Sequence, residues 1–180
     1  FIVEEGNFMF SADYSQIELR IMAHLANDQA LISAFKKGED IHSRTAAEIL
    51  GRPIKDIGEP ERRMAKAVNF GIIYGLSPFG LSRQLKISPK EAKAFIDQYF
   101  QLYKNVKNFM EETIQESKRR GYTKTLMNRK RYLPDLSSKN SQARKAAERI
   151  AINSPVQGSA ADIIKAAMIN LHRKFKEPIH

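Results

Sequence analysis

The chain has 180 residues, enough for one domain or for one domain with pieces of another. It contains no cysteine, which excludes disulfides and thiolate metal sites and fits a cytoplasmic protein. No segment approaches the apolar length of a membrane-spanning helix, and the N-terminus lacks the basic and apolar regions of a signal peptide. The first residue is Phe1 rather than Met, which is typical of an excised segment.

The net charge of +10 is unevenly distributed along the chain. Residues 1–40 carry a balance of −4, whereas residues 121–180 carry a balance of +8. A surface that only keeps a protein in solution usually mixes its signs. The asymmetry therefore favours a polyanionic partner, with nucleic acid as the first candidate.

The first elements are expected to be a strand and a helix. Residues 8–14 alternate between two faces, one of which carries Phe8 and Phe10, and this period predicts a β-strand. Ser15 and Glu18 have the spacing of a capping box, which predicts that a helix begins there. Further helices are predicted at residues 29–37, 42–50, 60–74, 78–85, 88–103 and 104–120.

The remainder of the chain predicts a hairpin and a last helix. Residues 122–133 indicate a hairpin that turns at Asn128-Arg129, after Gly121 ends the preceding helix. A helix begins near Ser141, and Pro155 predicts a kink in it because proline lacks an N–H group. The predicted fold class is mainly α with a small β component.

The segment Pro60–Gly75 is the most informative. On a helix, residues at steps of four share a face, and an apolar stripe lies about 200° away. The first face carries Arg62, Lys66, Phe70 and Tyr74. This row spans about 18 Å along the helix. The two cations at its N-terminal end suit a triphosphate, and the two rings at its C-terminal end suit a sugar and base. The alternative is a surface helix with solvated cations and aromatic core residues. Without other evidence, that alternative is favoured.

Two acidic residues near the start of the chain have a functional and an ordinary interpretation. Asp13 ends the predicted strand, and its carboxylate could bind Mg²⁺ together with the carbonyl of Tyr14. A single aspartate at such a place is more often a turn or cap residue. Glu18 fits the capping box with Ser15 without any further role.

A third polar row lies on the last helix. Arg149, Asn153 and Gln157 follow at steps of four and are rich in hydrogen-bond donors. Such donors can bond the minor-groove acceptors that occur at similar places in every correct base pair. The alternative, equally weighted, is a polar face opposite an apolar side.

Together these strings resemble family A (DNA polymerase I-like) DNA polymerases. Asp13-Tyr-Ser-Gln-Ile-Glu-Leu-Arg20 resembles motif A, and Arg62-Arg-Met-Ala-Lys66 with Asn69-Phe-Gly-Ile-Ile-Tyr-Gly75 resembles motif B, the O helix. Arg149 and Asn153-Ser-Pro-Val-Gln-Gly158 resemble the helix that follows. The order and separations match over essentially the whole chain. The resemblance implies a palm piece at residues 1–38, helical fingers at 39–140 and a palm-associated kinked helix at 141–180.

The resemblance also implies a role for each motif residue. Asp13 would be one of two metal-binding aspartates for Mg²⁺, with the Tyr14 carbonyl beside it, and Glu18 would crowd the position of a ribose 2′-OH. The catalytic group would comprise Asp13, Arg62 and Lys66. The deoxynucleoside triphosphate would be bound by Gln16, Glu18, His42, Arg62, Lys66, Phe70 and Tyr74. Primer–template DNA would be contacted by Arg20, Arg149, Asn153 and Gln157.

The function implied is template-directed DNA synthesis, in which a primer 3′-OH attacks a deoxynucleoside triphosphate by a two-metal mechanism. The family's His-Asp-Glu string, which carries the second aspartate, does not occur in this sequence. Asp162 lies in a predicted helix and Asp135 in a loop, so neither is expected to replace it. We therefore expect an internal segment of a longer polymerase, inactive alone, with the thumb and the rest of the palm elsewhere. The alternative is a non-catalytic nucleotide- or DNA-binding module.

Overall fold

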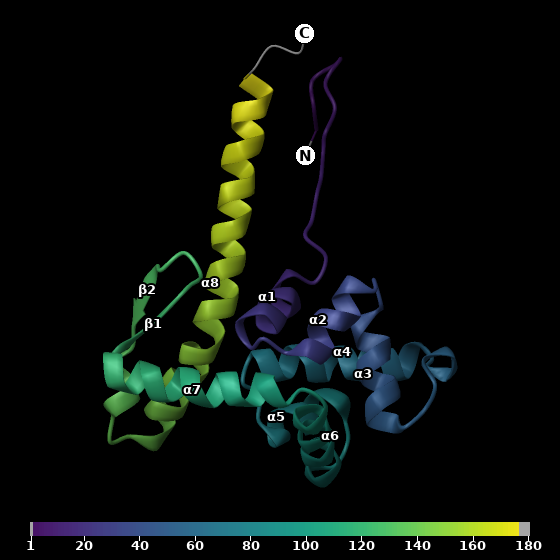
Figure 1. Ribbon diagram of the computed structural model, residues 1–180, viewed down its shortest axis with the longest axis vertical. Coiled ribbons are helices and arrows are strands. Elements are labelled where there is room, and N and C mark those ends of the chain that lie inside the picture. The colour runs from purple at the N-terminus through teal and green to yellow at the C-terminus, as the bar shows by residue number, and fades with distance from the viewer. Residues whose placement is uncertain (1, 177–180) are drawn as a thin grey trace.

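The computed structural model describes residues 2–176. It shows a body of packed helices from which the last helix and the N-terminal segment project in the same direction (Figure 1). The α-helices are α1 (Ile17–Leu25), α2 (Gln29–Lys36), α3 (Ile41–Leu50), α4 (Glu59–Ile73), α5 (Pro78–Leu85), α6 (Pro89–Leu102), α7 (Lys104–Arg120) and α8 (Ser141–Lys176). Short 3-10 turns lie at Ile54–Asp56 and Pro134–Ser137.

The β component is a single hairpin within the described residues. Strand β1 (Tyr122–Lys124) pairs antiparallel with β2 (Lys130–Tyr132), and Tyr122 lies opposite Tyr132. Asn128 adopts a left-handed conformation with φ of 62°, which reverses the chain where the sequence predicted the turn. The fold class, mainly α with a small β component, is confirmed.

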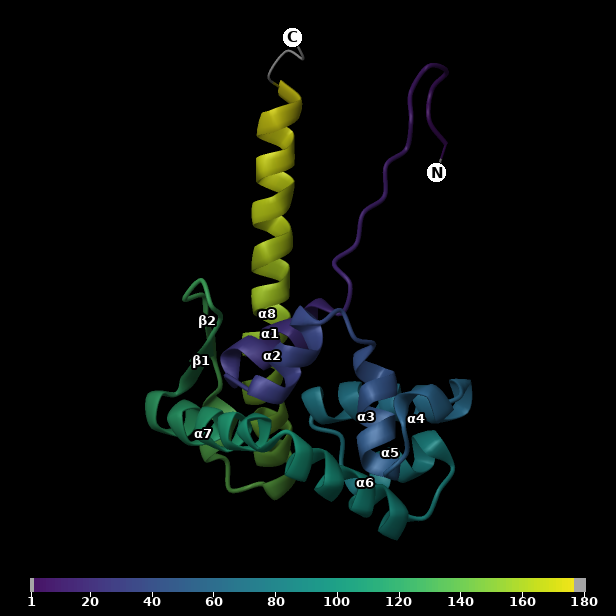
Figure 2. The ribbon, with the colours of Figure 1, turned by 45° about the vertical axis from the view of Figure 1, so that its right-hand side comes forward.

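The main core lies below the projecting part of α8 (Figure 2) and contains buried residues from each of the eight described α-helices. The apolar stripe of α4 faces it, with Val68 fully buried and Ile72 nearly so. Tyr99 and Tyr103 pack edge to face at 4.8 Å between ring centroids. A smaller cluster fixes the base of α8 and consists of Leu133, Leu136, Ala147 and Ala151.

Side-chain caps define where several helices begin. Ser88 and Glu91 form the predicted capping box of α6: the Glu91 amide donates to Ser88 Oγ at 3.2 Å, and the Ser88 amide donates to Glu91 Oε2 at 2.9 Å. Asp28 caps α2 by accepting from the Leu31 amide at 3.1 Å. Asp40 caps α3 and stands at one end of the site described below. These caps account for the close agreement of the helix starts with expectation.

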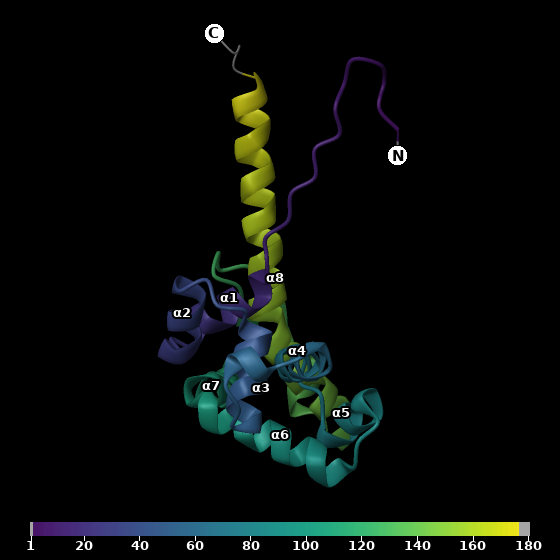
Figure 3. The same cartoon turned by 90° about the vertical axis from the view of Figure 1, so that its right-hand side faces the viewer.

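The strand predicted at residues 8–14 is wrong. This segment is extended but belongs to no sheet, and Phe8 and Phe10 are 96% and 81% exposed. A strand needs a neighbour for its backbone N–H and C=O groups, and the sheet of the described residues pairs β1 with β2, while this segment projects from the body apart from them (Figure 3). The alternation of side chains in the sequence identifies the two faces of this segment, but it does not show whether another strand pairs with it.

The capping box predicted at Ser15 and Glu18 is also wrong. The residue before α1 is Gln16, in a left-handed conformation with φ of 54°, and no side chain caps the helix. The Glu18 carboxylate instead accepts a hydrogen bond from α4. Glu18 is therefore bonded to Tyr74, which is distant in sequence, rather than to Ser15.

The last helix passes through the body and continues beyond it. Pro155 lies inside α8, and the Ser154 hydroxyl donates to the Ile150 carbonyl at 2.7 Å one turn earlier. The predicted kink at Pro155 stays a prediction. None of the helices in residues 2–176 combines the length and apolarity that crossing a membrane requires.

Candidate functional site

The row of four side chains on α4 divides between surface and core. Lys66 is exposed, Arg62 is half-buried, and Tyr74 is 39% exposed. Phe70 is partly buried and packs against the main core. The outward cations agree with either interpretation of this helix, and the partial burial of Phe70 agrees with the alternative of an aromatic core residue.

At the N-terminal end of the row, Arg62 is paired with the cap of α3. Its Nη2 and Nε donate to Asp40 Oδ2 at 2.9 and 3.3 Å. Burial tends to raise the pKa of Asp40, but the bonds from Arg62 and from the Ser43 amide outweigh it and lower that pKa to about 2. An anion that binds Arg62 must share this guanidinium with Asp40 or displace it.

Lys66 lies one turn further along and stands apart from this pair. Within residues 2–176 its ammonium group makes no hydrogen bond or ion pair. A lysine is a compact, strongly hydrated cation with three donors, so it can bind an anion without giving up a protein partner. Lys66 is thus the most accessible cation of the row.

At the C-terminal end, Tyr74 connects α4 to α1. Its hydroxyl donates to Glu18 Oε2 at 2.7 Å, and its ring stacks on Phe70 with centroids 6.1 Å apart and planes 24° apart. Burial and the Glu18 carboxylate raise the pKa of Tyr74 to about 12, against a smaller opposing effect of Gln157. The phenol is therefore neutral at physiological pH and holds Glu18 in place.

Helix α8 approaches the same end of α4. Gln157 is exposed and near enough to the Tyr74 hydroxyl to affect its pKa. Gly75, with φ of +65°, lies under the stem of Arg149: a Cβ at Gly75 would come within 2.8 Å of Arg149 Cγ. Asn153 has a buried Oδ1 with no hydrogen-bond partner. The structure thus brings two of the predicted DNA contacts to the rings of α4.

His42 lies behind the row, buried between α3 and α4. It is 2% exposed, and its ring lies 5.7 Å from that of Phe70. Its Nδ1 is 2.9 Å from Nδ2 of Asn69, a fully buried residue of α4. The packing of α3 on α4 therefore places His42 within the same site.

The N-terminal members of the predicted site are less enclosed. Asp13 and Tyr14 are exposed on the extended segment, and Gln16 is half-buried at the start of α1. Arg20 donates to the Ser15 carbonyl at 2.9 Å and lies 4.5 Å over the ring of Phe35. These contacts orient Arg20 without joining it to the α4 row.

The described residues do not fit a complete Mg²⁺ site. Three or more acidic or histidine side chains nowhere gather closely enough between residues 2 and 176 to hold a metal ion. Asp13 offers one carboxylate with the Tyr14 carbonyl as its neighbour in sequence. A hard cation of this kind needs about six oxygen ligands, some of which are waters.

Asp162 lies in α8, and its carboxylate is hydrogen-bonded within the described chain. Its Oδ2 accepts from Thr125 at 2.6 Å, and its Oδ1 accepts from Arg129 Nε at 3.0 Å. Arg129 also donates to the Gly158 carbonyl at 3.0 Å. This carboxylate fastens the hairpin to α8, close to Gln157.

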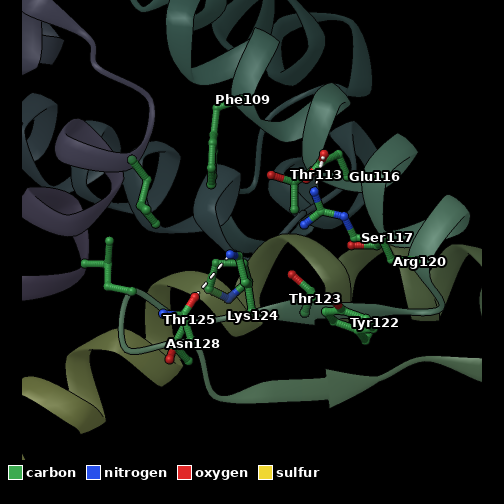
Figure 4. A pocket seen from close by; sticks show the side chains of 13 residues that line it. Phe109, Thr113, Glu116, Ser117, Arg120, Tyr122, Thr123, Lys124, Thr125 and Asn128 are labelled. Carbon is green, nitrogen blue, oxygen red and sulfur yellow. Dashed lines mark hydrogen bonds and ion pairs between the residues drawn. The ribbon is translucent and has the colours of Figure 1, made fainter.

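One hollow of the described chain lies away from these residues. It is a cavity of about 300 Å³ between α7, the hairpin and the end of α1 (Figure 4). Among its polar groups, Arg120 donates to Glu116 at 2.9 Å and Lys124 donates to the amide oxygen of Asn128 at 3.1 Å. None of the predicted site residues lines this cavity, so it does not define the site.

Sequence reasoning missed several residues that shape the site. Asp40 pairs with Arg62, and a buried network behind His42 includes Thr45, Asn69 and Tyr103. The sequence offered one signal for Asn69. Its amide lies on the same face of α4 as Ala65 and Ile73, and that face is otherwise apolar. The pairing of Asp40 had no comparable signal, because it depends on how α3 and α4 pack.

Comparison with known proteins agrees with this fold. Residues 1–179 match the family model described as DNA polymerase family A. This chain therefore belongs to DNA polymerase family A.

Among its relatives is DNA polymerase I of Caldicellulosiruptor bescii, which is 54% identical over 98% of this chain and 21% of that protein. DNA polymerase I of Bacillus subtilis is 52% identical over 97% of this chain and 20% of that protein. A solved structure, the POL domain of Pol1 from M. smegmatis in complex with DNA primer-template and dNTP, superposes with a TM-score of 0.88. It is 50% identical and covers 92% of this chain and 29% of that chain. The chain thus spans about a fifth of the length of the curated relatives it matches.

Proposed function

We propose that this chain forms the nucleotide-binding helix and part of the primer–template surface of a template-directed DNA polymerase. The reaction is nucleotidyl transfer from a deoxynucleoside triphosphate to a primer 3′-OH. The chain spans a fifth of the length of its relatives, so the activity belongs to a longer polymerase that contains it. Within that protein, residues 1–38 and 141–180 are assigned to the palm and residues 39–140 to the fingers.

The observation that carries the proposal is the layout of the outward face of α4. Arg62 and Lys66 lie toward its N-terminus, where the helix dipole also favours anions, and the stacked rings of Phe70 and Tyr74 lie at its other end. The first end suits the triphosphate, and the second suits the sugar and base. The bond from Tyr74 holds Glu18 at the ring end, which supports its proposed role of crowding a 2′-OH.

The primer–template surface is assigned to α8 and the hairpin. Arg149, Asn153 and Gln157 keep their spacing along α8, and Gln157 is exposed there. Several cations of the hairpin line a small hollow next to Gln157, namely Lys124, Arg129, Lys130 and Arg131. A cationic hollow next to polar donors suits a nucleic-acid backbone and minor groove. We add Arg20 to this surface.

Asp13 and the Tyr14 carbonyl are proposed as one part of a two-metal Mg²⁺ site. These groups alone do not complete such a site, so its second carboxylate must come from another part of the polymerase. We therefore expect the 180 residues alone not to extend a primer. A cytoplasmic location likewise stays a prediction.

The proposal is tested by primer extension with the longer polymerase that contains this segment. Asp13→Asn should abolish incorporation, and Lys66→Ala should lower kcat/KM for the nucleotide. Arg63→Ala serves as the control, because Arg63 is an exposed cation on another face of the same helix. Equal effects of Lys66→Ala and Arg63→Ala would contradict the assignment of the α4 face.

The chain alone provides a second arm of the test. Steady extension by the purified 180 residues, abolished by Asp13→Ala, would overturn the expectation that they lack a complete catalytic site. Binding of nucleotide or DNA by a longer protein that never extends a primer would favour the alternative, a non-catalytic binding module.

A further inference from the structure

Four buried polar side chains connect α3, α4 and the junction of α6 with α7. His42 is 2% exposed, and Thr45, Asn69 and Tyr103 are fully buried. A buried polar group is costly unless it is hydrogen-bonded, so these four must satisfy one another. The roles assigned above do not explain why the core-facing, otherwise apolar side of α4 contains the amide side chain of Asn69.

The hydrogen bonds of this network run in one direction. The Tyr103 hydroxyl lies 3.1 Å from Thr45 Oγ1, and it acts as the donor because the single Thr45 hydroxyl proton is directed to the Ile41 carbonyl. Thr45 shares its proton between the Ile41 carbonyl at 2.8 Å and Asn69 Oδ1 at 3.3 Å. Asn69 Nδ2 then lies 2.9 Å from His42 Nδ1. An amide nitrogen only donates, so Nδ1 of the imidazole accepts and the ring proton resides on Nε2.

The other ring nitrogen is not enclosed. Nε2 of His42 makes no hydrogen bond to any residue within 2–176, and the buried side-chain atoms without a partner in that range belong to Arg44, Tyr99 and Asn153. Nε2 therefore keeps contact with the surface although the ring as a whole is buried.

The charges around the ring favour its neutral form. Burial lowers the pKa of His42, and Arg62 and Lys66 of α4 lower it further, while Asp40 at the start of α3 acts in the opposite sense. The net effect is a lowered pKa, so the imidazole is uncharged near pH 7. A neutral imidazole has one donor nitrogen and one acceptor nitrogen. The group that neighbours Nδ1 determines which of the two nitrogens carries the proton.

We infer that Asn69 is a positioning residue that holds His42 with Nδ1 as an acceptor and Nε2–H as an uncharged donor at the surface near Lys66. On the proposed function, this donor faces a phosphate oxygen of the incoming nucleotide. The reverse orientation of the Asn69 amide would place the proton on Nδ1 and present a lone pair at Nε2, which would repel a phosphate. The orientation of one buried amide therefore determines whether His42 can donate to an anion.

The inference is tested by ¹⁵N NMR of the 180-residue chain without nucleotide, which reports the protonation of each imidazole nitrogen. The signals of His42 are assigned by their loss in His42→Gln. Near pH 7 we expect Nδ1 to be unprotonated and Nε2 to carry the proton. A His42 with its proton on Nδ1 would overturn the inference and needs no variant to interpret.

Variants test the part played by Asn69. In Asn69→Asp a carboxylate replaces the donor, so the proton should move to Nδ1 and His42 should titrate at higher pH. An unchanged tautomer in a folded Asn69→Asp would count against the inference. If that variant does not fold, Thr45→Val should weaken the preference for Nε2–H while Thr45→Ser keeps it. Equal tautomer populations in those two would contradict the network.

Failure of the proposed function gives a different result. Nucleotide is added to the wild-type chain and the Nε2–H signal is followed. A shift of that signal is expected, with weaker binding in His42→Gln. An unperturbed signal on saturation would remove His42 from the nucleotide site. The tautomer measured without nucleotide would still decide the inference about Asn69.

Discussion

The hydroxyl of Tyr74 at the end of α4 donates to Oε2 of Glu18 in α1 at 2.7 Å, across 56 positions of sequence. This contact joins the two motifs that carry the resemblance to family A polymerases. It also explains why Glu18 does not cap α1. The account of the site depends on it, because Glu18 at the ring end of α4 is held by Tyr74 rather than by its own helix.

The titration of Tyr74 should report this bond directly. Its pKa is raised to about 12 by burial and by Glu18, and Glu18→Gln removes the negative charge while keeping the side-chain volume. We expect the pKa to fall below 12 yet stay above the ordinary value of about 10, because burial remains. The ¹³Cζ resonance of Tyr74, identified by its loss in Tyr74→Phe, measures the change. An unaltered titration in Glu18→Gln would show that the contact does not persist in solution.

Sugar selection should depend on the bulk of Glu18. In the longer polymerase, Glu18→Ala opens the space of a 2′-OH and should raise the ratio of ribonucleotide to deoxynucleotide incorporation. Glu18→Gln keeps the bulk and should keep most of the discrimination. Because Glu18 does not cap α1, the alanine variant should not lose capping stability. Unchanged discrimination in Glu18→Ala would remove Glu18 from the sugar site.

The pair Asp40–Arg62 should make stability depend on acid pH. The folded-state pKa of Asp40, about 2, lies below its ordinary value of 3.8, so its contribution is complete above the ordinary value and is lost as pH falls through about 2. Asp40→Asn keeps an N-cap but loses the ion pair. It should lower the free energy of unfolding at about pH 7 by up to about 1 kcal/mol for this half-exposed pair, and by little at about pH 2.

Urea unfolding at the two pH values measures this difference. Asp97→Asn, which breaks the exposed i,i+4 pair with Lys93, is the matched control and should change little at either pH. A loss of stability in Asp40→Asn that is equal at both pH values would contradict the ion pair as its source.

The clamp between the hairpin and α8 should be visible in hydrogen exchange. Asp162 holds Thr125 and Arg129, and the Leu126 amide donates to Ser159 Oγ at 2.9 Å. Asp162→Ala should therefore speed exchange of the Leu126 amide, while the Ser43 amide, bonded to Asp40 at the distant start of α3, keeps its rate. Asp162→Asn should give an intermediate rate. No change in Asp162→Ala would mean that the hairpin is held in another way.

Local patterns predicted the parts of this fold that local interactions determine. The capping box of Ser88 and Glu91 lies within one helical turn and formed as expected. The helical period of 3.6 residues correctly assigned Val68 to the buried face of α4 and Lys66 to the exposed face. The hairpin turn at Asn128 followed from a conformation that few residues adopt.

Patterns that need a distant partner were predicted incorrectly or missed. Alternation at residues 8–14 was correct as a description of faces, but a strand also needs a neighbouring strand. Glu18 matched a local motif and a distant one equally well, and only the packing of α1 on α4 decides between Ser15 and Tyr74. The burial of Asn69 depends in the same way on where α3 lies.

Nucleotide titration of the 180-residue chain tests the central claim, that the outward face of α4 binds a triphosphate. Lys66→Ala should weaken binding of a deoxynucleoside triphosphate by roughly tenfold, because a charge-assisted bond is lost, and affinity of the parent chain should fall with salt. Arg63→Ala removes the same charge from a different face of the helix and should have a much smaller effect. The same dissociation constant for Lys66→Ala and the parent chain, measured by calorimetry, would contradict the account.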